Sequence, residues 1–155
     1  MSWWPRCLTI PRAPDFVIGP AERPYLLRWW IVPRNRLANL YLHRFCRSDD
    51  DRALHDHPWV NVSIILTGVY LEHLPDGAVK LRKAWRPWAP WRMTFRRAVA
   101  AHRIELIDGG RTVWTLFITG PKIRTWGFWC PQGWRRHDVF ASRTASGSEI
   151  TRGCE

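Results

Sequence analysis

The chain has 155 residues, of which 46% are hydrophobic and twelve are tryptophan, enough to build the core of one domain. It contains no run of about eighteen apolar residues and no evident signal peptide, so we expect a cytoplasmic protein that does not interact with membranes. The net charge of +11 is compatible with a nucleic acid or another polyanion as a partner. However, the 21 arginines are scattered from Arg6 to Arg152, which weakens that interpretation. The doublets Arg96-Arg97 and Arg135-Arg136 are the best local candidates for binding an anion.

The N-terminal segment is unusually rich in proline. Five prolines lie within residues 1–24, and this density disfavours both a helix and a central strand. We therefore predict an extended Pro-rich arm that lies over the core. Strand-like segments rich in aromatic and aliphatic residues follow it, at residues 28–32, 40–46, 60–67 and 69–73.

The same pattern continues through the second half of the chain. Pro75-Asp76-Gly77 predicts a turn before a returning strand at 79–85. Further strand-like segments lie at 92–97, 102–107, 111–119, 123–129 and 136–141. Short strands at regular spacing favour an all-β sandwich or barrel over residues 25–141. Residues 142–155 are small and polar, and we expect them to form a disordered tail.

The four cysteines are widely spaced and form no CxxC pair. Zinc-finger chemistry is therefore not indicated, and in a reducing compartment the simplest expectation is four free thiols. These residues are Cys7, Cys46, Cys130 and Cys154.

The strongest functional signal is the motif from Leu54 to Trp59, which contains His55 and His57. Residues two apart on a β-strand point to the same face, so the two imidazoles can meet at one point. His102 opens a later strand and can supply a third imidazole. Because imidazole is the commonest protein ligand of borderline transition metals, the pattern predicts a metal site at His55, His57 and His102. The alternative is that these histidines are structural and bind backbone groups or solvent.

This motif, followed by a strand that ends at Thr67-Gly68 and by a histidine on a later strand, resembles the two-motif signature of the cupin superfamily. The resemblance extends over about residues 40–140 and implies a single-domain double-stranded β-helix, or jelly roll. The position of the usual carboxylate ligand corresponds to Asn61 or Val62. A three-histidine set is similar to the thiol dioxygenase branch, which implies Fe(II) that binds substrate and dioxygen; Zn, Mn or Ni are alternatives. The resemblance also implies a homodimer.

Four further residues are candidates for the lining of a pocket. Asn61 shares strand parity with the histidine pair, and Trp59 follows the pair and Pro58. His43 alternates with aromatic residues, so it either packs in the core or lines the barrel. Glu72 is the reserve candidate for a carboxylate ligand.

Two classes of function follow from these observations. The first is a metal-dependent oxygenase that acts on a small molecule. The alternative is a cupin-fold binding module without turnover, whose basic and Trp-rich surface holds a nucleic acid or an anionic sugar. A metal-free sugar-nucleotide epimerase is a third hypothesis, but no acid–base pair can be assigned to it from the sequence.

Overall fold

The computed structural model describes residues 10–48, 53–89, 92–107, 111–143, 149–151 and 154. The predicted all-β architecture is confirmed: within the described residues, the only helix is the four-residue α1 (His137–Phe140). No helix in this part of the chain has the length and apolar character needed to cross a membrane.

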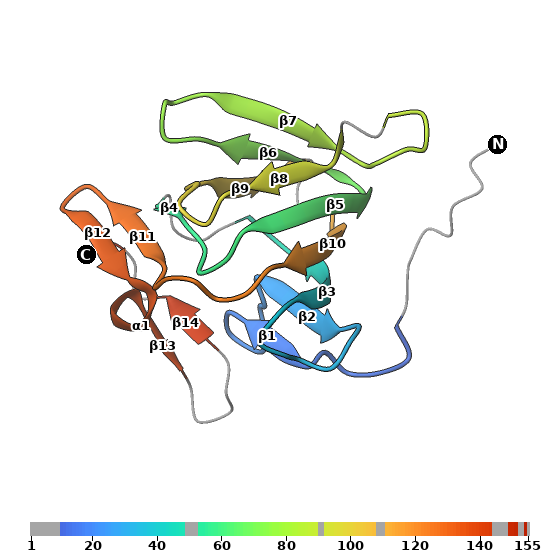
Figure 1. Ribbon diagram of the computed structural model, residues 1–155, viewed down its shortest axis with the longest axis horizontal. Coiled ribbons are helices and arrows are strands. Elements are labelled where there is room, and N and C mark those ends of the chain that lie inside the picture. The colour runs from blue at the N-terminus through green and yellow to red at the C-terminus, as the bar shows by residue number, and fades with distance from the viewer. Residues whose placement is uncertain are drawn as a thin grey trace.

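The largest sheet has eight strands. Its order is β13 (Ala141–Arg143), β14 (Glu149–Thr151), β1 (Phe16–Ile18), β2 (Leu26–Trp30), β3 (Asn39–Phe45), β10 (Val113–Thr119), β5 (Asn61–Thr67) and β8 (Thr94–Arg96). Strand β10 pairs with β3 on one side and β5 on the other, both antiparallel. This sheet forms the first layer of the molecule and runs from β8 to β1 across Figure 1.

Two three-stranded sheets form the second layer. One has the order β7 (Val79–Lys83), β6 (Val69–His73), β9 (Arg103–Leu106), and the other has the order β12 (Gly133–Arg136), β11 (Gly127–Cys130), β4 (Leu54–His55). An isolated antiparallel bridge between His55 and His102 connects them, so that β4 follows β9 in space. The two sheets of the second layer therefore meet at His55 and His102, which are two of the predicted metal ligands.

The main hydrophobic core lies between these layers. It contains Leu26, Phe45, Ile65 and Val113 from the large sheet, together with Tyr70 and Ile104 from β6 and β9, and Ala84. Gly68 makes the turn from β5 to β6 with a φ of 87°, a conformation that favours glycine. The turn predicted at Thr67-Gly68 is thus where the chain passes from one layer to the other.

The outer face of the large sheet carries a second aromatic cluster. Trp29 and Trp114 stack there with ring centroids 5.4 Å apart, beside Leu42. Ile10 from the N-terminal segment packs against them, and Trp29 Nε1 donates a hydrogen bond to the carbonyl oxygen of Arg12. Ile10 and Arg12 of the Pro-rich arm therefore lie at this face, whereas residues 16–18, which the sequence analysis also assigned to the arm, form β1 of the large sheet.

The C-terminal third differs from the expectations in three places. The strand predicted at 123–129 begins only at Gly127, and the strand predicted at 136–141 is replaced by α1, which lies between the end of β12 at Arg136 and the start of β13 at Ala141. The predicted tail contains strands β13 and β14, which pair with each other, and β14 also pairs with β1. These pairings provide the backbone of the tail with hydrogen-bond partners. The polar composition of the tail does not predict them.

The expectation of four free thiols is wrong, because Cys130 on β11 forms a disulfide with Cys154. The return of the chain through β13 and β14 brings Cys154 to Cys130, Ala53 and Phe128, with which it packs. Cys46 is a free thiol, as expected. Cys7 lies outside the described residues.

Candidate metal centre

The bridge between β4 and β9 places His55 and His102 directly opposite each other. The backbone N–H of each residue donates to the carbonyl oxygen of the other, at 2.9 Å in both directions. Side chains of directly paired residues emerge on the same face of a sheet. The two imidazoles therefore lie side by side, with ring centroids 4.8 Å apart.

His57 lies beside the other two histidines, but strand alternation, which predicted this position, is not the cause. Strand β4 ends at His55, so strand parity does not govern the position of His57. Instead, the backbone N–H of His57 donates to the carbonyl oxygen of Ala98 at 3.0 Å. Its Nε2 atom lies 2.9 Å from Nε2 of His102. One potential ligand nitrogen from each of the three histidines lies within 4.8 Å of the others.

The environment keeps the imidazoles of His57 and His102 neutral, which is the form that binds a metal. Burial, together with the charge of Arg96, lowers the pKa of His102 to about 3. Burial also lowers the pKa of His57 well below its usual value, and repulsion from His102 and His55 adds to this effect. At neutral pH, protons therefore do not compete with a metal ion for these two side chains.

Glu72 supports this arrangement from behind His102. Its Oε1 atom lies 3.0 Å from His102 Nδ1, and the carboxylate is 1% exposed. Burial alone would raise the pKa of Glu72, but the contacts with His102, Arg96 and Arg82 lower it below its usual range. A carboxylate at this distance from Nδ1 favours the tautomer with the proton there, which leaves the lone pair of Nε2 directed at the cluster. Glu72 is thus a partner of a candidate ligand, whereas the sequence suggested it as a ligand itself.

Two arginines fix the Glu72 carboxylate. Arg82 Nε donates to Glu72 Oε2 at 2.6 Å, and Arg96 Nε donates to Oε1 at 2.7 Å, with a second contact from Arg96 Nη2. Arg96 comes from β8 in the first layer, so this ion pair links the two layers beside the histidines. Arg96, which the sequence suggested for binding an anion, is therefore engaged with an internal carboxylate.

Asp56, between the two histidines, anchors their segment to β11 and β12. Its side chain is fully buried, and it accepts hydrogen bonds from Gly127 N at 2.8 Å and from Trp134 Nε1 at 3.0 Å. Arg124 forms an ion pair with it at 3.0 Å. Gly127 has no room for a side chain, because a Cβ atom would overlap the carbonyl oxygen of Arg135. The close approach of these strands therefore fixes the backbone around His55 and His57.

The three histidines line a cavity of about 360 Å³ between the two layers. Aromatic residues make up much of its wall: Phe16, Tyr25, Trp30, Tyr41, Phe45, Trp59, Tyr70, Phe117 and Trp126. Basic side chains also line it: Arg28, Arg34, Arg96 and Lys122. Among the described lining residues there is no carboxylate. The volume is at the small end of the range of ligand sites in proteins.

The structure places the other candidate residues in different positions. His43 and Trp59 line the cavity. Asn61 is 2% exposed at the start of β5, and its amide has no hydrogen-bond partner among the described residues. It lies outside the described cavity lining, although strand parity had suggested that it points toward the histidines.

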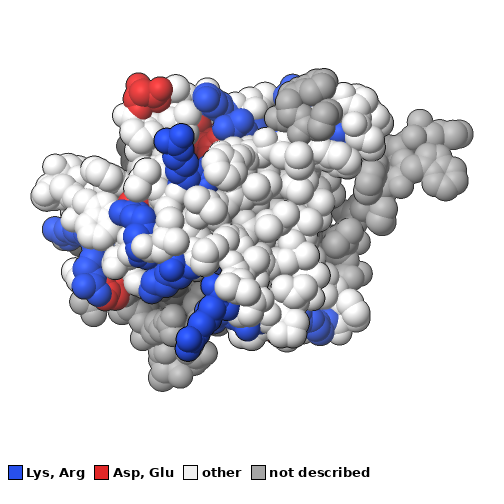
Figure 2. Space-filling view, viewed as in Figure 1, with Lys and Arg blue, Asp and Glu red and all other residues white. Residues whose placement is uncertain are grey.

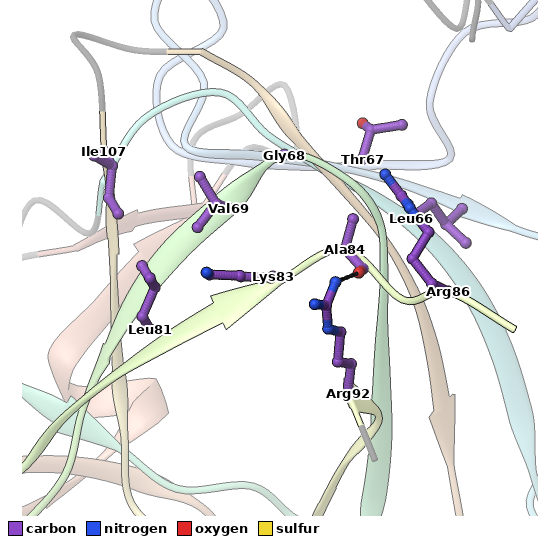
Figure 3. Close-up of a pocket in the computed structure, with 10 residues that line it drawn as sticks. All are labelled: Leu66, Thr67, Gly68, Val69, Leu81, Lys83, Ala84, Arg86, Arg92 and Ile107. Carbon is purple, nitrogen blue, oxygen red and sulfur yellow. Dashed lines mark hydrogen bonds between the residues drawn. The ribbon is translucent and has the colours of Figure 1, made fainter. Parts of the chain in front are cut away.

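A larger hollow of about 660 Å³ lies elsewhere on the molecule, around the turn from β5 to β6 and the end of β7. Figure 3 shows its lining, in which Arg92 donates a hydrogen bond to the carbonyl oxygen of Ala84 at 3.1 Å. The described residues that line it include no histidine, cysteine or carboxylate. These described residues therefore supply no set of ligands for a transition metal.

Comparison with solved structures identifies the fold. An uncharacterized conserved protein with a double-stranded β-helix domain from Klebsiella pneumoniae is 12% identical and superposes with a TM-score of 0.53, over 72% of this chain and 90% of that one. The chain has a double-stranded β-helix fold. This fold, which is that of the cupins, confirms the architecture implied by the resemblance.

Two further structures of similar fold carry functional names. The polyketide cyclase RemF from Streptomyces resistomycificus is 16% identical, with a TM-score of 0.53 over 70% of this chain and 72% of that one. A putative mannose-6-phosphate isomerase from Ralstonia eutropha is 14% identical, with a TM-score of 0.52 over 69% of this chain and 92% of that one. No family model matches the sequence, and neither does any curated protein. At these identities the similarity establishes the fold alone.

The donor set fits a divalent transition metal. Three imidazole ligands suit iron, zinc, nickel or copper, and they do not match the oxygen ligands that calcium and magnesium require. The cupin-fold barrel therefore contains a three-histidine cluster that could hold a metal ion.

Proposed function

We propose that this protein is an Fe(II)-dependent oxygenase that binds its metal at His55, His57 and His102 and oxidises a small molecule in the barrel cavity. The observation that carries the proposal is the convergence of three imidazoles on the wall of a closed-in cavity. Iron is chosen over zinc, manganese or nickel because of the resemblance of the histidine set to that of the thiol dioxygenases. When bound, the metal would act as a Lewis acid and as the electron donor to dioxygen.

The residues of the chain have separate tasks in this proposal. His55, His57 and His102 hold the ion on one wall, which leaves the cavity side open to ligands. Glu72 orients His102 and keeps its proton on Nδ1. The aromatic walls exclude water from the reacting groups, which strengthens electrostatic interactions inside the cavity.

The first test is elemental analysis of the anaerobically purified protein and of two variants. We expect near-stoichiometric iron in the wild type and loss of metal in His102→Ala. His73→Ala is the matched control, because His73 binds Glu105 at 2.7 Å and is not part of the cluster. It should keep its metal. The iron-loaded protein is then screened for oxygen uptake with small thiols and other small molecules.

Absence of metal in the wild type, even after reconstitution with Fe(II), would rule out the oxygenase. Bound zinc without oxygen uptake would also contradict it. The binding module without turnover remains the alternative; a steep salt dependence of nucleic-acid binding, without oxygen uptake, would favour it.

A further inference from the structure

Three loops meet at one end of the large sheet. The register places one residue from each of four neighbouring strands in a single row: Asn39 on β3, Thr119 on β10, Asn61 on β5 and Arg96 on β8. Residues 31–38 lead into this row, and residues 97–101 and 120–126 leave it. Because neighbouring strands are only about 4.8 Å apart, the three segments lie close together. We call these three segments the loop end.

Large apolar side chains are concentrated at the loop end. Leu37 is 78% exposed, Ile123 65% and Val99 63%, and each comes from a different loop. Single exposed apolar residues are normal on proteins, whereas a concentrated group of them marks an interaction site. Of the thirteen exposed large hydrophobic residues in the described part of the chain, seven belong to the loop end or directly precede its row. They are Ile31, Val32, Leu37, Phe95, Val99, Ile118 and Ile123.

The outer face of the large sheet continues this apolar surface. Ile118 on β10 is opposite Leu40 on β3 and Val62 on β5. Val62 is in turn opposite Phe95 on β8. Paired residues project from the same face, and strand alternation places Ile118 on the face that carries Trp114. The apolar surface therefore extends from the loops across four strands.

The backbone holds the apolar side chains of the loops in place. Leu37 lies in a turn organised by Asn35, whose side-chain oxygen accepts from Leu37 N at 2.9 Å. The Asn35 amide also donates to the carbonyl oxygen of Ala38 at 2.6 Å. In the neighbouring loop, Ile123 N donates to the carbonyl oxygen of Pro58 at 2.9 Å. Side chains presented on an ordered backbone lose less conformational freedom when they bind.

The charge of the loop end is entirely positive. Residues 31–38, 97–101 and 120–126 contain five basic residues and no Asp or Glu. Arg124 forms an ion pair with Asp56. The other four are exposed, and none of them forms an ion pair with a described residue: Arg34, Arg36, Arg97 and Lys122. Figure 2 shows Lys and Arg side chains spread over the visible face, with few acidic ones between them, and such a surface attracts anions.

Exposed aliphatic side chains among basic ones match the surface of an anionic bilayer. Aliphatic groups enter the boundary between headgroups and acyl chains, while Lys and Arg are attracted to anionic headgroups. A single-stranded nucleic acid would also be attracted by the charge, but its bases stack on aromatic side chains. Leu37, Val99 and Ile123 offer no ring for such stacking. A bilayer therefore fits the loop end better than a nucleic acid.

We propose that the loop end docks this protein on an anionic membrane surface, with Leu37, Val99 and Ile123 at the acyl boundary and the basic residues beside the headgroups. The sequence predicted no membrane interaction because it lacks an apolar segment long enough to span a bilayer, but peripheral docking requires no such segment. Docking also requires neither the metal nor the oxygenase reaction. Since the exposed Arg34 and Lys122 line the cavity of the three histidines, a docked bilayer would lie beside this cavity.

Co-sedimentation of the full-length protein with lipid vesicles tests this proposal. Vesicles of equal parts of phosphatidylcholine and phosphatidylserine are compared with vesicles of phosphatidylcholine alone, over a range of lipid concentrations. We expect the affinity for the anionic vesicles to be at least about tenfold higher, because each Lys or Arg near an anionic surface adds to binding. The difference should shrink at high salt concentration, since salt screens exposed charges.

The double variant Leu37→Ser/Ile123→Ser tests the apolar contribution. Both side chains are exposed, so the fold should be unaffected, which thermal unfolding checks. We expect binding to anionic vesicles to weaken at least about tenfold, because two large aliphatic side chains no longer leave water. The matched control is Leu81→Ser/Trp88→Ser, which removes exposed apolar side chains on β7 and in the segment after it and should leave binding unchanged.

Equal affinity for the two kinds of vesicle, no binding to either, or unchanged binding in Leu37→Ser/Ile123→Ser would overturn membrane docking. If vesicles are not bound, two further measurements assign the surface to another partner. Salt-sensitive binding of single-stranded RNA would assign the positive charge to a nucleic acid. A dimer that dissociates in Leu37→Ser/Ile123→Ser would assign the apolar side chains to contact with a second copy of the chain.

Discussion

At the scale of single residues, the candidate site depends on side chains that touch no ligand. Glu72 and Asp56 are both buried, and each is surrounded by two or more donors. Carboxylates in such positions orient the groups around them, because the ion pairs and hydrogen bonds have well-defined directions. Their removal should therefore affect metal binding and stability in different ways.

Glu72→Gln tests the role of Glu72 as the partner of His102. The amide retains an acceptor but loses the charge, so it holds the His102 proton less firmly. We expect metal affinity to fall about 10–100-fold, the usual effect of removing a carboxylate behind a ligating histidine. Competition titration with a chelator measures this. Glu105→Gln, which alters an exposed carboxylate bound to His73, should leave the affinity unchanged.

Asp56→Ala removes the anchor between the histidine segment and β11. It leaves the Arg124 guanidinium, Gly127 N–H and Trp134 Nε1 without this acceptor. Loss of one member of a buried charged pair costs about 3–5 kcal/mol, and the partial exposure of Arg124 favours the lower end. Urea unfolding would show this. Asp56→Asn keeps one acceptor and should lose less; equal stability of the alanine variant and the wild type would contradict the anchor.

At the scale of elements, the short strand β4 is held by its neighbours. It pairs with β11 on one side, through Phe128 and His55, and with His102 on the other. Strand β11 in turn carries Cys130, which is bonded to Cys154. The C-terminal segment is thus linked covalently to the strand that supports the histidine cluster, 24 residues earlier in the chain.

Cys154→Ser should lower the free energy of unfolding by about 2–4 kcal/mol, the typical contribution of a disulfide that closes a loop of this length. Cys46→Ser serves as the control, since Cys46 is a free thiol, and should change stability little. Thermal unfolding with and without a reducing agent measures the effect. If the reducing agent destabilised the wild type and Cys154→Ser equally, the disulfide would not be the cause.

At the scale of the whole molecule, the two faces of the large sheet serve different purposes. Its inner face lines the cavity, and its outer face carries the Trp29–Trp114 stack beneath the N-terminal segment. Since the sheet separates the two faces, stability and ligand binding can be changed independently. A substitution on the outer face tests whether stability can change while metal binding does not.

Trp114→Ala should destabilise the fold by about 3–5 kcal/mol, because it removes a large side chain that is 5% exposed. The folded fraction should nevertheless keep its metal content, since Trp114 does not line the cavity. Trp88→Ala is the control: this side chain is 73% exposed, and its loss should change stability by no more than about 0.5 kcal/mol. Loss of metal from folded Trp114→Ala would contradict the separation of the faces.

Local patterns in the sequence determined the strands and the histidine motif. Alternating apolar residues and turn signals such as Pro75-Asp76-Gly77 act over a few residues, so they predicted β6, the turn and β7. They did not predict α1 or β14, because such short elements form only where neighbouring strands supply partners. The disulfide depends on the same return of the tail.

Tertiary structure alone decided which residues surround the candidate metal centre. The sequence indicated His55, His57 and His102, since a histidine pair before a strand is a local pattern. The role of Glu72, which supports His102, depends on the register of strands far apart in the chain. Register between distant strands is set by the packing of both layers, and no local pattern in one strand encodes its partner.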